Sequence, residues 1–378
     1  MFAKRNLMRV RRGRYLLLLL VLVCGGCLVT FFLHYTTNTT YDVILTAVDI
    51  HQWNFQPGQW RGEERPPDRL PNDDNNGNTP HRRALQYLVK EDGLCSGHPD
   101  LDIIAYVHSA PEKVDNRQLI RNTWGNTRYY NEMKMRVIFV FGSAKTEKER
   151  ELVTQESQQY HDIVQLKFDD TYKNLSLKGV GALQWVTEHC PGPTWVLKSD
   201  DDMIINIFAL SSYLQYITTP MMSSVSHQHS VTPLPNNRIM CAVWYGMPVL
   251  RGTGCAKWCV TEEEWPHKTF PTYCSGSAFV FPNNVTRRLY HAYFHAPFLW
   301  VDDAYITGVL SREAGIGHHP IHSLYELNHQ LIEQNLVKGN RIFCHHPGSA
   351  NVRAKWWSFI ASKEGQPWNF TNSPKLPS

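Results

Sequence analysis

Short apolar segments alternate with helix-like segments between residues 101 and 197, and this alternation limits the possible folds more than any other feature. Buried parallel strands read as nearly continuous apolar runs, and a helix usually connects one strand to the next. The segments that form the pattern are 101–107, 135–141, 162–168 and 194–197 for the strands and 115–124, 146–160 and 175–188 for the helices. We therefore predict an α/β fold with a mainly parallel sheet and helices on both faces.

A long uncharged run near the N-terminus predicts a membrane anchor. Residues 15–33 form a run of nineteen uncharged residues, close to the roughly 20 that a bilayer-spanning helix needs. Basic residues precede the run and no acidic residue appears before Asp42, so the positive-inside rule leaves residues 1–14 as a cytoplasmic tail. We expect a transmembrane signal-anchor helix at 15–33. The alternative, a cleaved signal peptide, has a shorter apolar core of about 7–15 residues.

The segment that follows the anchor, residues 34–95, has no clear hydrophobic period and is rich in Pro, Asn and Asp. It cannot bury enough apolar surface to fold alone, so we interpret it as a lumenal stem. Residues 96–378 are long enough for one large globular domain. The net charge is +4 and six basic residues lie in the tail, so the rest is nearly neutral. A nucleic-acid-binding protein with a basic stripe is therefore excluded.

Cysteines and glycosylation triplets are consistent with an oxidising lumen. Of nine cysteines, Cys24 and Cys27 lie in the predicted anchor. The other seven are disulfide candidates that leave at least one thiol over. Asn174, Asn284 and Asn369 begin Asn-x-Ser/Thr triplets and are candidate glycosylation sites.

Three adjacent carboxylates, Asp200, Asp201 and Asp202, follow the last predicted strand directly. Ligands of open α/β sheets bind beyond the carboxyl ends of strands. Adjacent carboxylates repel one another unless a positive group lies among them, and oxygen ligands suit Mg²⁺ or Mn²⁺. The pattern favours a divalent-cation site over the alternative of a solvated acidic turn.

Two further groups of charged residues are candidates for chemistry. Arg117 and Arg121 are four residues apart, on one face of a predicted helix, and two guanidiniums on one face suit a diphosphate. A solvent-facing basic helix is the alternative. Asp302 and Asp303 precede another predicted helix; either side chain is suited to cap that helix or to act as a general base.

Taken together, these motifs resemble the β1,3-galactosyltransferase and β1,3-N-acetylglucosaminyltransferase family, which is related to Fringe. The resemblance extends from about residue 101 to residue 345. The matching segments are 117–125 (RQLIRNTWG), 139–142 (FVFG), 169–178 (DDTYKNLSLK), 198–206 (KSDDDMIIN), 257–258 (KW) and 273–277 (YCSGS). The sequence DDAYITG at 302–308 differs from the family pattern E-D-V-Y-x-G. Asp replaces Glu, Ala replaces Val, and one residue is added before the Gly.

The resemblance implies a GT-A fold, a single-pass type II topology in the Golgi membrane, a UDP-sugar donor and Mn²⁺. It implies that Asp202 contacts the metal, that His322 completes the metal site, with His318 and His319 as alternatives, and that Asp303 is the base. The residues that it places around the donor, besides the two arginines, are Tyr172, Asn174, Lys178, Lys198, Asp200 and Asp201. Trp258 and Gly276 are expected beside the acceptor, although Trp258 is equally suited to a core.

The activity that the resemblance implies is inverting transfer of galactose from UDP-galactose, in β1,3 linkage, to an acceptor sugar of a glycoprotein or glycolipid. Two alternatives remain open at this point. One is a β1,3-N-acetylglucosaminyltransferase that uses UDP-GlcNAc. The other is a catalytically inactive lumenal binding relative, for which Ala304 and the added residue are the first indications.

Overall fold

The computed structural model consists of two units, residues 1–64 and 65–378, and we describe each by itself. The described residues are 16–24, 27–35, 83–130, 133–218, 237–252, 255–328, 330–337, 341–346 and 348–364.

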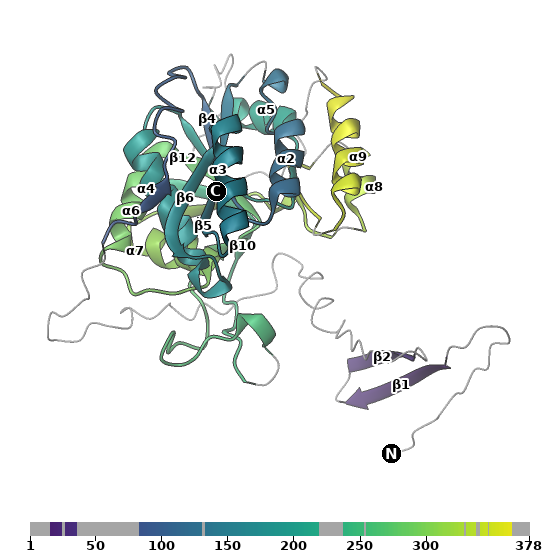
Figure 1. The fold of residues 1–378 in the computed structure, drawn as a ribbon. Coiled ribbons are helices and arrows are strands. Elements are labelled where there is room, and N and C mark those ends of the chain that lie inside the picture. Colours follow the sequence, from purple (N-terminus) through teal and green to yellow (C-terminus); the bar gives the residue numbers. More distant parts are fainter. Residues whose placement is uncertain are drawn as a thin grey trace, which may run out of the picture. The chain divides into compact units, whose positions relative to one another are not determined.

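The first unit contains an antiparallel pair of strands, β1 (Leu16–Cys24) and β2 (Cys27–Tyr35), drawn in purple in Figure 1. Their register runs from Leu16 opposite Tyr35 to Cys24 opposite Cys27. The predicted helix at 15–33 is therefore not what the structure shows. A uniformly apolar run fits a buried strand as well as a helix, and its Val, Thr and Phe residues favour strands. Among the described residues, no helix is long and apolar enough to cross a membrane.

The second unit is built on an eight-stranded sheet in the order β13-β9-β12-β7-β4-β5-β6-β3. The four central strands β7, β4, β5 and β6 are parallel, whereas β3 and β12 run antiparallel to their neighbours. The strands are β3 (Tyr87–Val89), β4 (Ile103–His108), β5 (Met135–Ser143), β6 (Ile163–Asp169), β7 (Trp195–Asp200), β9 (Arg238–Cys241), β12 (Ala278–Pro282) and β13 (Gly317–Pro320). The mainly parallel sheet is confirmed.

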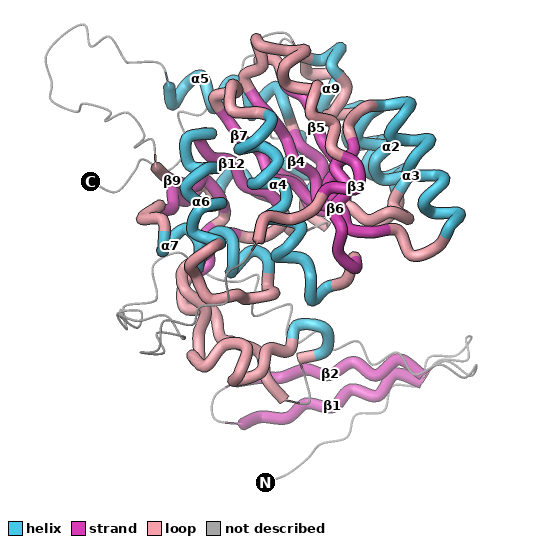
Figure 2. The backbone as a smooth tube through the Cα atoms, turned by 60° about the vertical axis from the view of Figure 1, so that its left-hand side comes forward, coloured by secondary structure: helices cyan, strands magenta, loops and turns pink. Residues whose placement is uncertain are grey.

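Helices cover both faces of this sheet, as Figures 1 and 2 show. One face carries α4, α6 and the π-helix η5, and the other carries α2, α3, α5 and α9. The helices are α2 (Val114–Asn122), α3 (Glu147–Tyr160), α4 (Leu175–His189), α5 (Ile207–Thr218), α6 (Thr286–Tyr293), η5 (Ala304–Leu310), α7 (Ser311–Glu313), α8 (Ile332–Val337) and α9 (Ala350–Ala361). The three helices predicted from 115 to 188 are present, and Thr146 caps α3 in a reciprocal capping box with Glu149.

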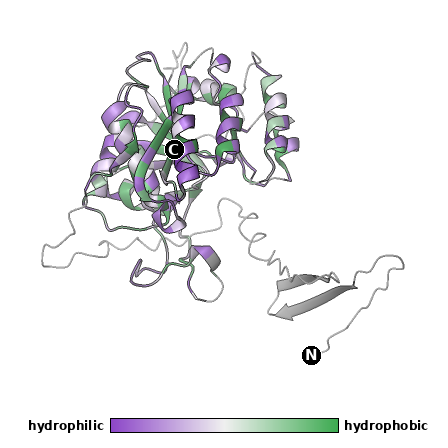
Figure 3. Cartoon of the chain, viewed as in Figure 1, coloured by the Kyte–Doolittle hydropathy of each residue, from purple (hydrophilic) through white to green (hydrophobic). Residues whose placement is uncertain are grey.

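Alternation of side chains explains why the strands are apolar throughout. In β4, Ile104 and Tyr106 belong to one core cluster, whereas Ile103, Ala105 and Val107 belong to the other. Both faces are thus buried, and the most apolar colours of Figure 3 fall largely on the central strands.

Smaller elements complete the second unit. A three-stranded sheet, β14-β15-β8, and a two-stranded sheet, β10-β11, lie outside the main sheet. These strands are β8 (Met203–Ile205), β10 (Val243–Trp244), β11 (Tyr273–Cys274), β14 (Tyr325–Glu326) and β15 (Phe343–His345), and the 3₁₀ turns are η1 (Thr127–Tyr129), η2 (Tyr172–Asn174), η3 (Ala256–Trp258), η4 (Asn283–Val285) and η6 (His322–Leu324).

Three disulfides join distant or looped segments of the second unit. They are Cys95–Cys190, Cys241–Cys274 and Cys255–Cys259. Cys344 is buried and has no disulfide partner. The expectation that the seven cysteines beyond residue 33 form disulfides and leave one thiol over is confirmed.

Candidate active site

The three adjacent aspartates lie at the carboxyl edge of the sheet, where β7 ends at Asp200. The chain turns at Asp201 and Asp202 and leaves the main sheet, because β8 pairs with β15 instead. Asp200 accepts a 2.6 Å hydrogen bond from Lys198 Nζ. Burial raises the pKa of Asp200 to about 6, although the charge of Lys198 opposes the shift.

Asp201 is bound to the residue that follows β4 and to the first turn of α2. Its carboxylate accepts hydrogen bonds from Ser109 Oγ at 2.7 Å and from Asn116 Nδ2 at 2.9 Å. Burial raises the pKa of Asp201, and these two bonds oppose the rise. Both oxygens have protein donors, so Asp201 holds the triad in place against the neighbouring loop.

Asp202 faces a histidine that is 143 residues away in the sequence. Its Oδ2 lies 3.2 Å from His345 Nε2, while Oδ1 is buried and has no hydrogen-bond partner. Burial tends to raise the pKa of Asp202, but the hydrogen bond and charge of His345, with the charge of Arg353, lower it overall. Asp202 also raises the pKa of His345 against the effect of burial. The pair is a strongly polar centre with an unused carboxylate oxygen.

Asp202 and His345 are the residues best placed to hold a metal ion. The unpartnered Oδ1 and the imidazole are both suitable ligands for Mn²⁺, and the pair fits such an ion if the remaining ligands come from a bound diphosphate or water. Within the described ranges, no cluster of three His, Cys, Asp or Glu residues has the arrangement of a complete protein-built metal site.

The histidine predicted for the metal site, His322, is placed elsewhere. Its Nε2 lies 2.9 Å from the carbonyl oxygen of Val243. Of the two alternatives, His318 contacts the carbonyl of Thr307 at 2.6 Å, and His319 pairs within β13 opposite Met240. His345 is brought to Asp202 because β15 pairs antiparallel with β8, directly after the triad.

The second acidic pair lies at the start of η5, close to the same edge of the sheet. Asp303 caps this helix: its Oδ1 accepts from the backbone N–H of Ala304 at 2.8 Å and its Oδ2 from that of Gly276 at 3.2 Å. Burial raises the pKa of Asp303, and the two N–H groups, with the charge of Lys198, oppose the rise. Each oxygen can accept another hydrogen bond, so a half-buried carboxylate is available for a proton.

Two buried lysines bring positive charge beneath these acids. Lys198 is 1% exposed and also donates to the carbonyl oxygen of Gly276. Burial tends to lower its pKa, but Asp200, Asp302 and Asp303 raise it overall. Lys178, in α4, bonds Asp170 at 2.9 Å and donates to the carbonyl of Ser109. Lys198 therefore connects the triad to the Gly276 loop, and Lys178 connects the ends of β4 and β6.

The two arginines that we expected to bind a diphosphate form ion pairs and hydrogen bonds within the protein instead. Arg117 is fully buried, and its five N–H donors bond Glu156 twice, Ser109, and the carbonyls of Ala110 and Pro111. Arg121 forms a bidentate pair with Asp162 at 2.8 Å and contacts Glu156 at 2.7 Å. The prediction of direct donor contacts is therefore corrected, because both guanidiniums form ion pairs with carboxylates of α3 and of the α3–β6 junction.

Replacing Arg117 by Met should lower the free energy of unfolding by about 3–5 kcal/mol, as is typical when one partner of a buried ion pair is removed. The change leaves the Ser109 hydroxyl and the carbonyls of Ala110 and Pro111 without this donor, and it removes one of the two guanidiniums that pair with Glu156. The measurement is urea denaturation of the Arg117→Met variant.

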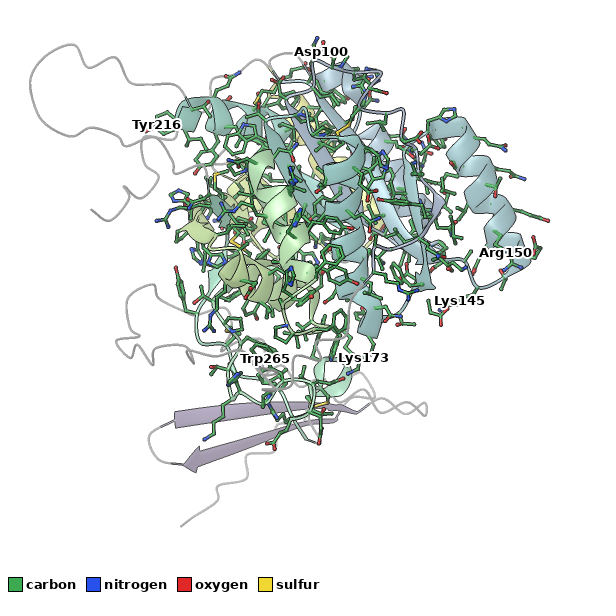
Figure 4. The ribbon with its side chains drawn as sticks, turned by 90° about the vertical axis from the view of Figure 1, so that its left-hand side faces the viewer. Asp100, Lys145, Arg150, Lys173, Tyr216 and Trp265 are labelled. Carbon is green, nitrogen blue, oxygen red and sulfur yellow. A yellow bond between two sulfur atoms is a disulfide. The ribbon has the colours of Figure 1, made fainter. Side chains whose placement is uncertain are left out.

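The matched control is Arg150→Met, because Arg150 pairs with Glu147 on the exposed side of α3 (Figure 4). Its unfolding free energy should be nearly that of the native protein, because an exposed ion pair contributes little to stability. Equal effects of the two substitutions would contradict a structural role for the buried arginine network.

An aromatic and basic cluster is formed by Tyr172 of η2, Lys257 and Trp258 of η3, and Trp300, which precedes η5. Trp258 is 40% exposed; it stacks on Trp300 at 6.3 Å and meets Tyr172 edge to face at 5.7 Å. Lys257 Nζ donates to the Tyr172 hydroxyl at 2.8 Å. Trp258 is therefore a surface residue rather than a core residue. An exposed aromatic face of this kind can stack on a sugar ring.

The neighbouring predicted donor residue, Asn174, donates from Nδ2 to the carbonyl of Asp169 at 2.9 Å. Lys173 extends the adjoining surface by pairing with Glu264 at 2.7 Å; Figure 4 draws Lys173 and Trp265 close together in this region. Asn174 thus fixes the turn between β6 and α4 in the present structure.

Comparison with known proteins identifies the family of the chain. The model of the family described as galactosyltransferase matches residues 115–322, which is more than half of the chain. The chain belongs to the galactosyltransferase family. A mouse (Mus musculus) acetylgalactosaminyl-O-glycosyl-glycoprotein beta-1,3-N-acetylglucosaminyltransferase is 30% identical over 242 residues, or 62% of this chain and 58% of that protein. Human (Homo sapiens) beta-1,3-galactosyltransferase 1 is 26% identical over 285 residues, or 75% of this chain and 81% of that protein.

Among solved structures, galactosyltransferase LgtC in complex with donor and acceptor sugar analogs aligns with a TM-score of 0.35 and 9% identity. The alignment covers 70% of this chain and 97% of that chain.

A cavity of about 450 Å³ lies apart from the acids of this galactosyltransferase-family domain. It is lined by residues that include His98, Arg121, Arg136 and Asp162, and not by the triad or by Asp303. Arg136 and Asp162 lie near the amino ends of β5 and β6. We therefore place the candidate active site at the carboxyl edge of the sheet, where the acidic residues lie. The size of this cavity does not decide the position of the site.

Sequence reasoning missed His345 in this galactosyltransferase-family member. His345 lies beyond residue 322, where the family match ends, and it is followed by His346, so neither spacing nor neighbours distinguish it. The pairing of β15 with β8 is what identifies His345. This pairing joins distant segments and cannot be predicted from the sequence pattern.

Proposed function

We propose that this protein is an inverting β1,3-hexosyltransferase of GT-A fold that uses a UDP-sugar donor, with galactose as the first candidate sugar. The observation that carries the proposal is the presence of two different acidic centres at one edge of the sheet. Asp202 faces His345 and keeps an unused oxygen. Asp303 is held by two backbone N–H groups. The first suits a metal-bound diphosphate and the second suits a general base.

In the proposed reaction, Asp303 removes the proton of the acceptor 3-hydroxyl as that oxygen attacks C1 of the donor sugar. The bond between C1 and the phosphate oxygen breaks, and UDP leaves with the electron pair. A single displacement from the opposite face inverts the anomeric carbon, so an α-linked donor gives a β-linked product. The N–H groups of Gly276 and Ala304 orient the carboxylate. Trp258 would stack on the acceptor ring.

Asp202 and His345 would hold Mn²⁺, which when bound neutralises the charge of the diphosphate. Asp200 and Asp201 keep Asp202 in position through their bonds to Lys198, Ser109 and Asn116. Lys178 supports the same edge from α4.

N-Acetylglucosamine is the second candidate sugar, because a relative named as an N-acetylglucosaminyltransferase is 30% identical to the chain. Hydrolysis of UDP-Gal, UDP-GlcNAc and UDP-GalNAc by the purified protein distinguishes the candidates. We expect UDP-Gal to be turned over fastest. Preference for UDP-GlcNAc would favour the second candidate, and no turnover of any donor would favour an inactive binding relative.

We also propose a type II Golgi membrane topology with the second unit in the lumen, supported by the basic tail before residues 15–33 and by three disulfides. Asn284 is exposed in η4 and is a suitable glycan acceptor, whereas Asn174 uses its amide internally and Asn369 lies outside the described residues. Intact microsomes should protect the chain beyond residue 33 from protease, and glycosidase should shift its mobility. Digestion of the C-terminal part without detergent would contradict this topology.

A further inference from the structure

We infer that His108 is a positioning residue of this site: its neutral ring accepts a hydrogen bond from the protonated carboxyl of Asp302, so the proton stays on Asp302 beside the base Asp303. The inference rests on the proposed function. His108 is the last residue of β4 and lies outside residues 115–322, which match the family.

The two side chains face each other in a buried space. His108 Nδ1 lies 3.5 Å from Asp302 Oδ2, and the residues are 7% and 9% exposed. The other polar atom of each, His108 Nε2 and Asp302 Oδ1, is buried without a hydrogen-bond partner. The separation is long for a hydrogen bond, as is common for catalytic groups before substrate binds. No Lys or Arg of the described residues forms an ion pair with Asp302, so a negative charge there would be buried without a directly bonded partner, which is costly.

The backbone around the pair leaves it little freedom. Gly179, in α4, lies so close that a Cβ atom at this position would be 2.6 Å from Asp302 Oδ1. His108 also packs against Tyr106, with ring centroids 5.6 Å apart. Glycine at 179 is thus required by the close approach of Asp302, and the carboxyl is held between α4 and the end of β4.

The charges around the pair favour a protonated Asp302 and a neutral His108. Burial, with the charges of Lys198 on β7 and Lys178 on α4, puts the pKa of His108 well below its usual value. Burial raises the pKa of Asp302 to about 7; Asp303 and Asp200 add to the rise, whereas the two lysines oppose it. A neutral imidazole can accept a proton in a hydrogen bond, and a protonated carboxyl can donate one.

The two adjacent carboxyls therefore have different protonation states: Asp302 holds a proton and Asp303 is ionised. Neighbouring carboxylates that share a site titrate as a pair, and one of them holds the proton. With His108 as acceptor, the shared proton stays on Asp302, and Asp303 is ionised and ready to take the acceptor's proton. Without His108, the proton spends part of its time on Asp303, which then cannot act as a base.

The test compares two variants by the pH dependence of kcat for sugar transfer. His108→Phe keeps a ring but has no acceptor, whereas His108→Asn keeps a polar atom near the position of Nδ1. In His108→Phe the acid limb should move to higher pH by about one unit, so that turnover on that limb falls about tenfold. His108→Asn should restore most of the native profile, and UDP affinity should be native in both. Superimposable profiles, or equal losses in both variants at every pH, would overturn the role of His108.

A second measurement does not depend on turnover. At a pH above the pKa of Asp200, the infrared carbonyl band of a protonated carboxyl should be present in the native protein and absent from Asp302→Asn. In His108→Phe this band should disappear at a lower pH than in the native protein. A band that titrates identically in both proteins would overturn the inference. Absence of any transfer by the native protein would instead contradict the proposed function.

Discussion

Replacing Asp303 by Asn should reduce turnover by about 10²–10⁴-fold, the usual contribution of a general base. Asn has nearly the same shape, but it cannot take the proton of the acceptor hydroxyl. Because Asp303 is held by the backbone N–H groups of Gly276 and Ala304, the loss should appear in kcat while UDP affinity changes little. The measurement is steady-state transfer at saturating donor, with UDP binding measured in parallel.

Asp302→Asn is the matched control for this experiment. An amide resembles the protonated carboxyl that we assign to Asp302, so this variant should lose far less turnover than Asp303→Asn. Near-native turnover of Asp303→Asn, or a larger loss in Asp302→Asn, would remove Asp303 from its assigned role.

Replacing Asp202 by Ala should abolish detectable transfer and metal-dependent binding of UDP. The variant loses the carboxylate whose Oδ1 is unpartnered and whose Oδ2 faces His345. His345→Ala should weaken metal-dependent UDP binding in the same direction. Calorimetric titration of UDP with and without Mn²⁺ measures both effects, and a chelator should reproduce them in the native protein.

His322→Ala provides the control for these variants, because His322 contacts the Val243 carbonyl and not Asp202. Its Mn²⁺-dependent binding of UDP should be native. Retained transfer in chelator-treated native protein would show that the triad is structural. Loss of metal-dependent binding in His322→Ala, but not in His345→Ala, would contradict the assignment of His345.

The sheet and its acidic edge could be predicted because local patterns determine them. The apolar runs that become β4, β5, β6 and β7 are buried on both faces, so they carry the signal of parallel strands without help from distant residues. The position of Asp200–Asp202 at a strand end follows from the same pattern. Thr146 and Glu149 likewise define the start of α3 within four residues.

The partners of charged side chains could not be predicted, because they depend on contacts between distant segments. Arg117 has the spacing of an anion-binding residue, but Glu156, 39 residues away, takes up its guanidinium. His345 reaches Asp202 across 143 residues. The apolar run at 15–33 has no polar periodicity to separate a helix from a strand, and the structure pairs its two halves as β1 and β2.

The most direct test of the central claim is the structure of the product formed from a UDP-sugar and an acceptor glycoside. Anomeric proton couplings and through-bond correlations in the NMR spectrum of the purified product identify the new linkage. The account predicts a β-linked hexose on the 3-hydroxyl of the acceptor sugar, formed from UDP-Gal or UDP-GlcNAc. An α-linked product would contradict the single displacement at Asp303, and no product from any UDP-hexose would contradict the transferase assignment.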